Sequence, residues 1–396
     1  MQTKIKPEYK ANPEIAELDG ILKSCVHCGF CNATCPTYTI LGSELDGPRG
    51  RIYLVKGMLE GKGGEKTRIH LDRCLGCRSC ETTCPSGVKY GRLVDRARNL
   101  LERPFAERLK NRMLLFLLPE KKRFSLVMKL ARLLKPFLPL HVSAKIFPER
   151  KAESFESARH ERKMLLLEGC ALPVASPQTN LSASRVLDEL GIATVKAAGC
   201  CGAMHQHMGE IGAARERARR NIDAWWPDVE SGTEAIVSTS SGCGLQVKEY
   251  GELLKDDPDY NEKAFRISLL TKDIAEVLER EDLSVFSGEG RKIAFHCPCT
   301  LQHGQKLSGL VESILLRCRH ALTPIADPHL CCGAAGTYFL LQPGISGRLL
   351  EKKIAALEGG KPEIIATANV GCQMQIESGT GIPVKHWIEL LDNERK

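Results

Sequence analysis

Two cysteine-rich stretches near the start of the chain share one spacing, C-x2-C-x2-C-x3-C-P. The first ends at Cys35, before Pro36, and the second ends at Cys84, before Pro85. Three thiolates at steps of three residues wrap a loop around one face of a [4Fe–4S] cluster, and in two-cluster ferredoxins the fourth cysteine binds the other cluster. The spacing predicts one cluster held by Cys25, Cys28, Cys31 and Cys84, and a second held by Cys74, Cys77, Cys80 and Cys35.

Structural zinc is the alternative metal for these stretches, because zinc sites also use four cysteines. Such sites generally pair two C-x2-C knuckles and need no third cysteine at the same step. The pattern therefore favours a small, α-rich, ferredoxin-like module with two clusters over residues 1–100. Between the motifs, Gly47 and Pro48 predict a turn into a helix. Arg49 and Arg51 on that helix either donate hydrogen bonds near a cluster and raise its potential, or lie in solvent.

A second cysteine pattern occurs twice in the rest of the chain, which predicts two equivalent domains, residues 161–285 and 286–396. In each copy a cysteine precedes a Cys-Cys-Gly triplet by 30 or 32 positions, and a last cysteine follows the triplet's second cysteine by 42 or 40 positions. The first copy contains Cys170, Cys200, Cys201 and Cys243, and the second contains Cys297, Cys299, Cys331, Cys332 and Cys372.

Short apolar runs lead into these cysteines and are typical of buried strands. They cover residues 164–167, 235–238, 293–295 and 364–366, with helical patterns such as 182–190 and 213–225 between them. Strands that alternate with helices predict parallel α/β sheets. Ligand sites in such sheets lie beyond the carboxyl ends of the strands, so we expect the thiols of each copy to meet at one sheet edge.

Such a group of thiols could hold a further iron–sulfur cluster, a zinc ion or a redox dithiol, whereas the structural alternative is a set of small buried side chains. Adjacent cysteines can face one centre only if the backbone bends, which Gly202 and Gly333 would permit. Packed thiolates repel unless a cation or oxidation neutralises them, so we expect metal or a disulfide in at least one copy and favour a third cluster in the second. Cys318 is expected to be inert. The flanking histidines, His205, His207, His296 and His303, are expected to be hydrogen-bonded rather than metal-bound.

Composition and charge exclude several other classes of protein. The chain has 396 residues and 18 cysteines, and its opening residues contain no apolar signal segment, so we expect a reducing compartment and metal-bound thiolates rather than disulfides. No apolar run is long enough to predict a membrane-spanning helix. The net charge of +8 comes from residues 92–163, because the remaining residues sum to a slightly negative charge. A nucleic-acid binder is therefore not indicated.

The basic segment is predicted to be a connector over residues 101–160. Residues 105–147 contain ten Lys/Arg and two Asp/Glu. The apolar residues Phe124, Val127, Met128, Ala131 and Leu134 repeat at steps of three and four, between Pro119 and Pro136. This spacing predicts an amphipathic helix. Its apolar stripe either lies on an anionic membrane surface or packs on the protein's own domains or on a partner subunit.

The order of these parts resembles the iron–sulfur subunits related to heterodisulfide reductases. Stretches such as CVHCGFCNATCPTY, ARRNIDAWWP, FHCPCTLQH and LCCGAAGTY are similar to the glycolate oxidase iron–sulfur subunits. The resemblance implies a complex with a flavin-bearing catalytic subunit and a second flavin-domain subunit. It implies oxidation of glycolate, or of D-lactate, with electrons passing to the respiratory acceptor, and a cytoplasmic complex peripherally associated with the inner membrane, in contact with lipid or quinone.

One departure from the heterodisulfide reductases concerns the repeats. Their pattern continues C-x-x-C after the triplet, whereas here Gln246 and Gln375 replace the last cysteine. Heterodisulfide chemistry is thereby put in doubt.

The residues themselves indicate an electron carrier. Removing a hydride from a 2-hydroxy acid needs a flavin to split the electron pair, and the sequence contains no G-x-G-x-x-G after a predicted strand. No catalytic residue is predicted. The alternatives are the iron–sulfur subunit of a lactate or glycerol-3-phosphate dehydrogenase, a reductase of quinone or disulfide centred on the repeats, and a zinc-bound structural protein.

Overall fold

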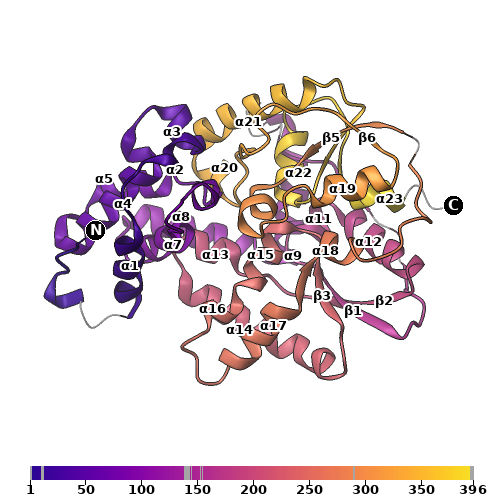
Figure 1. The fold of residues 1–396 in the computed structure, drawn as a ribbon, viewed down its shortest axis with the longest axis horizontal. Helices are drawn as coiled ribbons and strands as arrows, with labels where there is room; N and C mark the ends of the chain where they lie inside the picture. The colour runs from indigo at the N-terminus through magenta and orange to yellow at the C-terminus, as the bar shows by residue number, and fades with distance from the viewer. Residues whose placement is uncertain are drawn as a thin grey trace.

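The computed structural model describes residues 2–9, 13–137, 143, 145–151, 153, 155–288 and 290–392. A helical module occupies one end of the long axis, and two parallel α/β units fill the rest (Figure 1). This arrangement confirms the predicted fold class. Part of the predicted connector, residues 138–142, 144, 152 and 154, lies outside the described residues.

The N-terminal module is built from short helices around a small apolar core. The helices are α1 (Pro13–Ser24), α2 (Phe30–Ala33), α3 (Pro36–Leu41), α4 (Pro48–Gly57), α5 (Glu65–Asp72), α6 (Ser79–Thr82) and α7 (Tyr90–Asn99), with the short turns η1 (Pro7–Tyr9), η2 (Glu44–Asp46) and η3 (Met58–Lys62). Pro36 and Pro48 stand at the first positions of α3 and α4, where the missing N–H is not needed. Leu18, Leu22, Leu71 and Leu93 are fully buried in the core.

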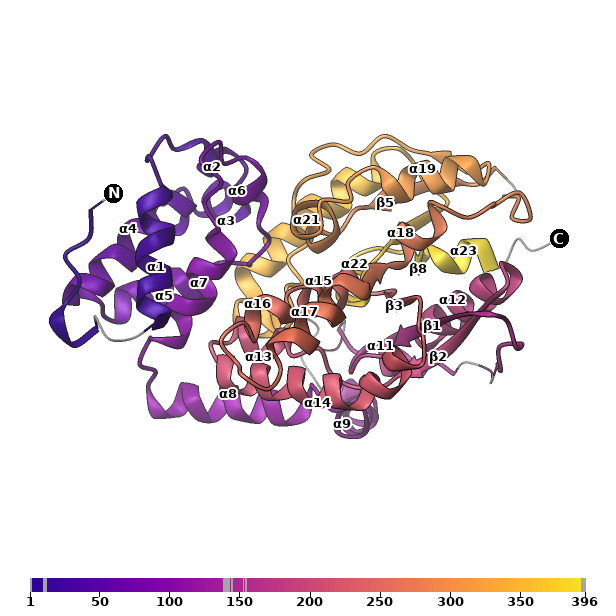
Figure 2. The ribbon, with the colours of Figure 1, turned by 60° about the horizontal axis from the view of Figure 1, so that its bottom comes forward.

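Two basic helices, α8 (Phe105–Leu117) and α9 (Lys121–Leu134), connect the module to the repeats and are followed by the turn η4 (Lys135–Phe137). They lie along the lower edge of the molecule in Figure 2. None of the helices in the described ranges combines the length and the apolar character needed to cross a bilayer.

Each repeat contains a four-stranded parallel sheet with the same strand order. The first sheet is β2-β1-β3-β4, from β1 (Arg162–Leu167), β2 (Ile192–Ala197), β3 (Ala235–Ser238) and β4 (Thr271–Asp273). The second is β6-β5-β7-β8, from β5 (Lys292–His296), β6 (Ala321–Leu322), β7 (Ile364–Thr367) and β8 (Val384–His386). The four predicted strands are thus the central pair of each sheet, where both faces are covered.

The helices of the two repeats cover both sheets. Those of the first are α11 (Leu172–Ala175), α12 (Pro177–Glu189), α13 (Ala203–His207), α14 (Ile211–Glu230), α15 (Ser241–Lys248), α16 (Tyr250–Leu253), α17 (Asn261–Leu270) and α18 (Ile274–Leu278). Those of the second are η5 (Thr300–Gly304), α19 (Leu310–Arg317), α20 (Tyr338–Leu341), α21 (Pro343–Glu358), α22 (Val370–Glu377) and α23 (Ile388–Asp392). One shared core includes Met164 and Leu166 of β1 with Ile293 and Phe295 of β5, so one face of each sheet packs against the same apolar layer.

The module docks on both repeats through polar contacts near its second cysteine loop. Arg78 donates a bond from Nη2 to Glu249 Oε2 of the first repeat at 2.8 Å. Tyr338 of the second repeat donates from Oη to the backbone oxygen of Arg73 at 2.8 Å, and Thr82 Oγ1 lies 3.0 Å from His303 Nδ1. The second cysteine loop is therefore enclosed by segments from all three parts of the chain.

Candidate metal centres

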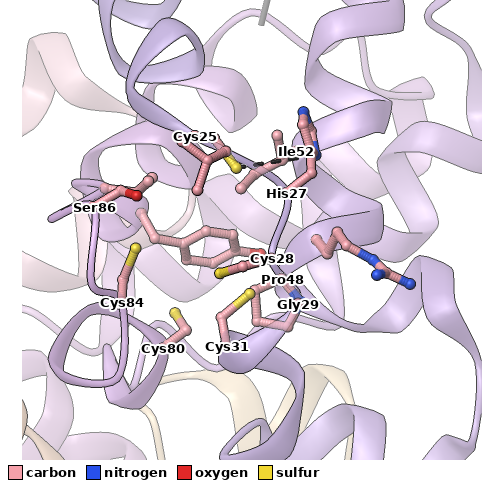
Figure 3. Close-up of a pocket in the computed structure, with 14 residues that line it drawn as sticks. Cys25, His27, Cys28, Gly29, Cys31, Pro48, Ile52, Cys80, Cys84 and Ser86 are labelled. Carbon is pink, nitrogen blue, oxygen red and sulfur yellow. Dashed lines mark hydrogen bonds between the residues drawn. The ribbon is translucent and has the colours of Figure 1, made fainter.

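Five of the module's cysteines line a first cavity, and they come from both motifs: the four predicted for the first cluster, and Cys80. Cys25, Cys28 and Cys31 from the first loop meet Cys84 from the end of the second motif. Figure 3 shows the sulfurs of Cys28, Cys31 and Cys84 turned towards one space. Cys25 Sγ lies 4.0 Å from His27 Nδ1 at the edge of the same cavity. The structure therefore brings together the four residues predicted for the first cluster.

A second cavity is lined by Cys35, Cys74, Cys77 and Cys80, the set predicted for the second cluster. Cys80 and Tyr90 line both cavities, so the two sites adjoin. The backbone N–H of Gly76 donates to Cys74 Sγ at 3.4 Å, which is a bond that would stabilise a metal-bound thiolate.

The two loops reach this geometry through the same backbone pattern. The residue before the second cysteine has a positive φ in both loops, 58° at His27 and 65° at Gly76. The residue after that cysteine does too, with 84° at Gly29 and 60° at Arg78. Left-handed backbone is costly for the two non-glycine residues, so the surrounding structure must hold them in place. The equal spacing of the motifs thus reflects equal loop shapes.

The electrostatics of the cavities show that the thiols are close neighbours. Burial, followed by the charges of Cys25, Cys84 and Cys28, raises the pKa of Cys31 to about 11. Burial, followed by the charges of Cys77, Cys74 and Cys35, raises the pKa of Cys80 well above its ordinary value. Four thiolates at such a site repel one another unless a cation neutralises them. The donor set and its crosswise pairing fit one [4Fe–4S] cluster per cavity.

The two arginines after Pro48 have different environments. Arg51 lines the second cavity and is 1% exposed, and it donates from Nε to the backbone oxygen of His70 at 2.7 Å and from Nη1 to Thr37 Oγ1 at 3.1 Å. Arg49 lines the first cavity but is partly exposed and paired with Glu44 at 2.6 Å. Arg51 is therefore the guanidinium with a fixed place beside the cysteines, a distinction that sequence alone left open.

The cysteines of the first repeat form a single chain of interacting thiols. The thiol of Cys170, followed by that of Cys201, lowers the pKa of Cys200, and the thiols of Cys200 and Cys243 raise the pKa of Cys201. The φ of Gly202 is 88°, which provides the bend expected after the Cys-Cys pair. A Cβ on Gly169, the neighbour of Cys170, would stand 3.7 Å from Cys243 Sγ, so the first and last cysteines of the group also lie near each other.

The second repeat has the same sequential arrangement. Cys299 Sγ lies 4.0 Å from Cys331 Sγ. The thiol of Cys331 lowers the pKa of Cys332, whereas the thiol of Cys372 and burial raise it. The net pKa of Cys332 is well above its ordinary value. The φ of Gly333 is 87°, and a Cβ there would stand 2.8 Å from the backbone oxygen of Ser346. The Cys-Cys-Gly loop is therefore held tightly against α21.

The group predicted for the second repeat contains either Cys297 or Cys299 beside the three later cysteines, and the structure places Cys297 elsewhere. Cys297 is buried in the apolar core shared by the two sheets, together with Leu301 and Val311, and does not lie with the other thiols of its repeat. Side chains alternate between the two faces of β5, so Ile293, Phe295 and Cys297 face the shared core while Ala294 faces the cysteine side. Cys318 is also buried in that core, as an inert cysteine would be.

The histidines near the cysteines divide into two kinds. His303 is bonded to Thr82, and His207 Nδ1 lies 3.4 Å from Asp95 Oδ1, as expected of hydrogen-bonded residues. His296, in contrast, is 2% exposed, and neither of its ring nitrogens has a hydrogen-bond partner. Its imidazole and the sulfurs of Cys332 and Cys372 all lie within 4.8 Å of one another. Sequence reasoning therefore missed His296 as a member of the site.

Family models match the N-terminal module and each of the two repeats. Residues 21–88 match the "4Fe-4S dicluster domain", and residues 164–248 and 293–377 each match the "Cysteine-rich domain". A hypothetical protein from Helicobacter pylori shares the fold, with a TM-score of 0.58 at 10% identity, over 98% of this chain and 74% of that one.

Named relatives cover nearly the whole chain. The glycolate oxidase iron–sulfur subunit of Escherichia coli (strain K12) is 51% identical over 99% of this chain and 98% of its own length. The probable glycolate oxidase iron–sulfur subunit of Bacillus subtilis (strain 168) is 28% identical over 95% and 92%. Lactate utilization protein A of Bacillus licheniformis is 28% identical over 58% of this chain and 99% of its own length. The chain therefore belongs to the family of glycolate oxidase iron–sulfur subunits, and it is an iron–sulfur subunit of an oxidoreductase complex.

Proposed function

We propose that this chain carries electrons from a flavin-bearing subunit, which oxidises glycolate to glyoxylate, towards a membrane acceptor. The observation that carries the proposal is the pair of adjoining cavities, each of which brings together the four cysteines of one predicted cluster from both motifs. When bound there, [4Fe–4S] clusters supply single-electron carriers, whereas a 2-hydroxy acid gives up a hydride, so a flavin on another subunit has to split the pair. A second flavin-domain subunit is the further proposed partner.

Glycolate is the favoured substrate of the complex. The relative from Escherichia coli named for glycolate oxidase matches the chain end to end at 51% identity, whereas the lactate-utilisation relative matches 58% of it. D-lactate and glycerol 3-phosphate are the competing substrates.

The isolated chain, loaded with iron and sulfide, is expected to show no glycolate-dependent reduction of an artificial acceptor. Activity should appear when the flavoprotein subunits are added, and glycolate should be preferred over D-lactate and glycerol 3-phosphate. Spectrophotometric assay of the separate and combined subunits measures this. Turnover by the flavin-free chain would contradict the electron-carrier role and favour a reductase centred on the repeats.

We also propose a third iron–sulfur centre at the thiols of the second repeat. These thiols adjoin the second cavity, because one buried cluster joins the two. Cys331 and Leu75 belong to this cluster, and Cys77 and Cys299 pack against it. A third centre would therefore continue the series of redox sites from the module into the repeats. The iron content of the purified chain tests this, since about twelve irons rather than about eight are expected.

Part of the predicted apolar stripe of α9 packs on the protein itself. Phe124 and Met128 are buried against Leu172, Ala175 and Val370 of the two repeats. That part therefore follows the packing alternative. A different row on the same helix, Leu126, Leu130 and Leu133, is more than half exposed, as are Leu109, Met113 and Phe116 on α8.

This exposed row supports peripheral membrane association at the cytoplasmic face of the inner membrane. Its side chains are spaced at four and three residues, and the exposed lysines Lys121, Lys122 and Lys129 stand on the same helix. Apolar side chains flanked by lysines complement an anionic lipid surface, which attracts each basic residue by about 1 kcal/mol. We propose that anionic lipid is the occupant of this surface.

Changing Lys121, Lys122 and Lys129 to Glu is expected to weaken binding of the complex to vesicles with anionic lipid roughly 100-fold or more at low salt, because three attractions are lost. Flotation with vesicles measures it. The same change at three exposed lysines of the second repeat, Lys292, Lys352 and Lys361, is the matched control and should have little effect. Arg132 and Lys135 are unsuitable for this test because they donate to the backbone oxygens of Phe147 and Ile146. Equal binding of the two triple variants would contradict the lipid proposal.

A further inference from the structure

The second repeat contains a buried imidazole that the fold leaves without a partner. His296 is the last residue of β5, at the carboxyl end of the sheet. It is 2% exposed, and both Nδ1 and Nε2 lack hydrogen bonds. Buried polar groups are normally satisfied, so an unsatisfied pair of ring nitrogens needs an explanation. A ligand at the sheet edge would provide one.

The direction of this side chain is set by the strand. Alternation along β5 places Ala294 on the side of Cys332 and Cys372, and His296, two residues later, is on that side too. One ligand atom each from His296, Cys332 and Cys372 lies within 4.8 Å of the other two. An imidazole and two thiols at such separations are a donor set that metals bind.

A buried cation stands beside the same thiols. Lys353 of α21 is 2% exposed, and its Nζ donates to the backbone oxygens of Asp327 at 3.2 Å and Pro328 at 3.5 Å. Burial lowers the pKa of Lys353, whereas the charges of Cys332 and Cys331 raise it. The side chain of Lys353 thus offers a hydrogen-bond donor beside these thiols, and hydrogen bonds to the sulfurs are one of the factors that set the potential of an iron–sulfur centre.

The first repeat lacks both features at the equivalent positions. Three residues before its first cysteine it has Leu167, where the second repeat has His296 before Cys299. Gly202 packs on the backbone oxygen of Ala214, and Gly333 packs on that of Ser346. Ala214 and Ser346 therefore occupy equivalent positions in the two repeats. Seven residues further along each helix, the first repeat has Asn221, whose Nδ2 donates to the backbone oxygen of Cys200 and to Tyr250 Oη, and the second has Lys353. The two sites are alike in thiols but differ in these neighbours.

We propose that His296 is a nitrogen ligand of a metal centre in the second repeat, bound with Cys332 and Cys372 and completed by Cys331 and Cys299. This inference rests on the third centre proposed above and specifies its chemistry. Replacing thiolate by imidazole raises the potential of an iron–sulfur centre. The second repeat would then hold a better electron acceptor than the module. The residues of metal-binding type that line the two cavities of the module are cysteines, with His27 at the edge of the first cavity.

The test uses the complete complex, purified without oxygen, with His296 changed to Leu, the residue of the first repeat. Nitrogen-14 coupling to the reduced third centre, measured by pulsed electron paramagnetic resonance, is expected in the native protein and should be lost in His296→Leu. His303→Gln is the matched control and should keep the coupling, because His303 is bonded to Thr82 and lies outside the thiol group. His296→Cys should retain the centre without the coupling and at a more negative potential.

The outcomes separate the histidine from the third cluster. A third iron–sulfur centre without nitrogen coupling, or with coupling unchanged in His296→Leu, would overturn the ligand role and leave the third centre standing. About eight irons plus one zinc that is lost from His296→Leu would support the ligand and overturn the third cluster. About eight irons and no other metal would overturn both. If the leucine variant does not fold, the cysteine variant gives the same comparison.

Discussion

Replacing Cys84 with Ser is expected to impair the cluster of the first cysteine motif and to spare that of its own motif. The reason is that Cys84 lines the cavity of Cys25, Cys28 and Cys31, although it follows Cys80 in the sequence. A hydroxyl is a poorer ligand for iron than a thiolate, so this cluster should be lost or converted to a three-iron form, with about one cluster fewer per chain. Electron paramagnetic resonance of the reduced and oxidised protein distinguishes the two clusters.

The converse substitution, Cys35→Ser, should impair the cluster of Cys74, Cys77 and Cys80 instead. Cys318→Ala is the control, because Cys318 is buried in the core shared by the repeats, away from both cavities. If Cys84→Ser removed the cluster of the second motif, the crosswise assignment would be wrong.

Replacing Arg51 with Met is expected to destabilise the module and to make its second cluster harder to reduce. Arg51 is buried against the second cavity, and its Nη2 lies 3.7 Å from Asp46 Oδ1. Removing one partner of a buried ion pair costs about 3–5 kcal/mol, although the contacts of Asp46 with His70 and Arg73 remain and would limit the loss. Loss of a nearby positive charge and its hydrogen bonds lowers the potential of an iron–sulfur centre.

Arg49→Met is the matched control for this prediction. Arg49 is two residues away on the same helix, is partly exposed and pairs with Glu44 near the surface, so its loss should change the stability of the module very little. Chemical denaturation of the loaded protein and redox titration of the two clusters are the measurements. If the two substitutions changed stability and cluster potential equally, the buried position of Arg51 beside the second cavity would not be the cause of its effect.

Much of this architecture could be predicted because it depends on local spacing. The cysteine steps and the strand-to-cysteine order are sequence properties, and they predicted which thiols meet in three of the four groups without change. The sequence did not predict that His296 faces the site and that Cys297 faces the shared core. The two residues are adjacent, and the face that each occupies depends on where β5 ends. The exposed row of Leu126, Leu130 and Leu133 was also missed. The row that contains Phe124 and Met128 has the same helical spacing, and sequence alone predicted that row as the apolar face of the helix.

The enclosure of the second cysteine loop has a consequence for the order of biogenesis. The loop leaves the ribosome early, whereas Glu249, His303 and Tyr338, which contact it or its neighbours, are made much later. A cofactor-delivery protein can reach this loop freely only before those later segments fold onto it. We infer that insertion of the inner cofactor precedes docking of the repeats on the module.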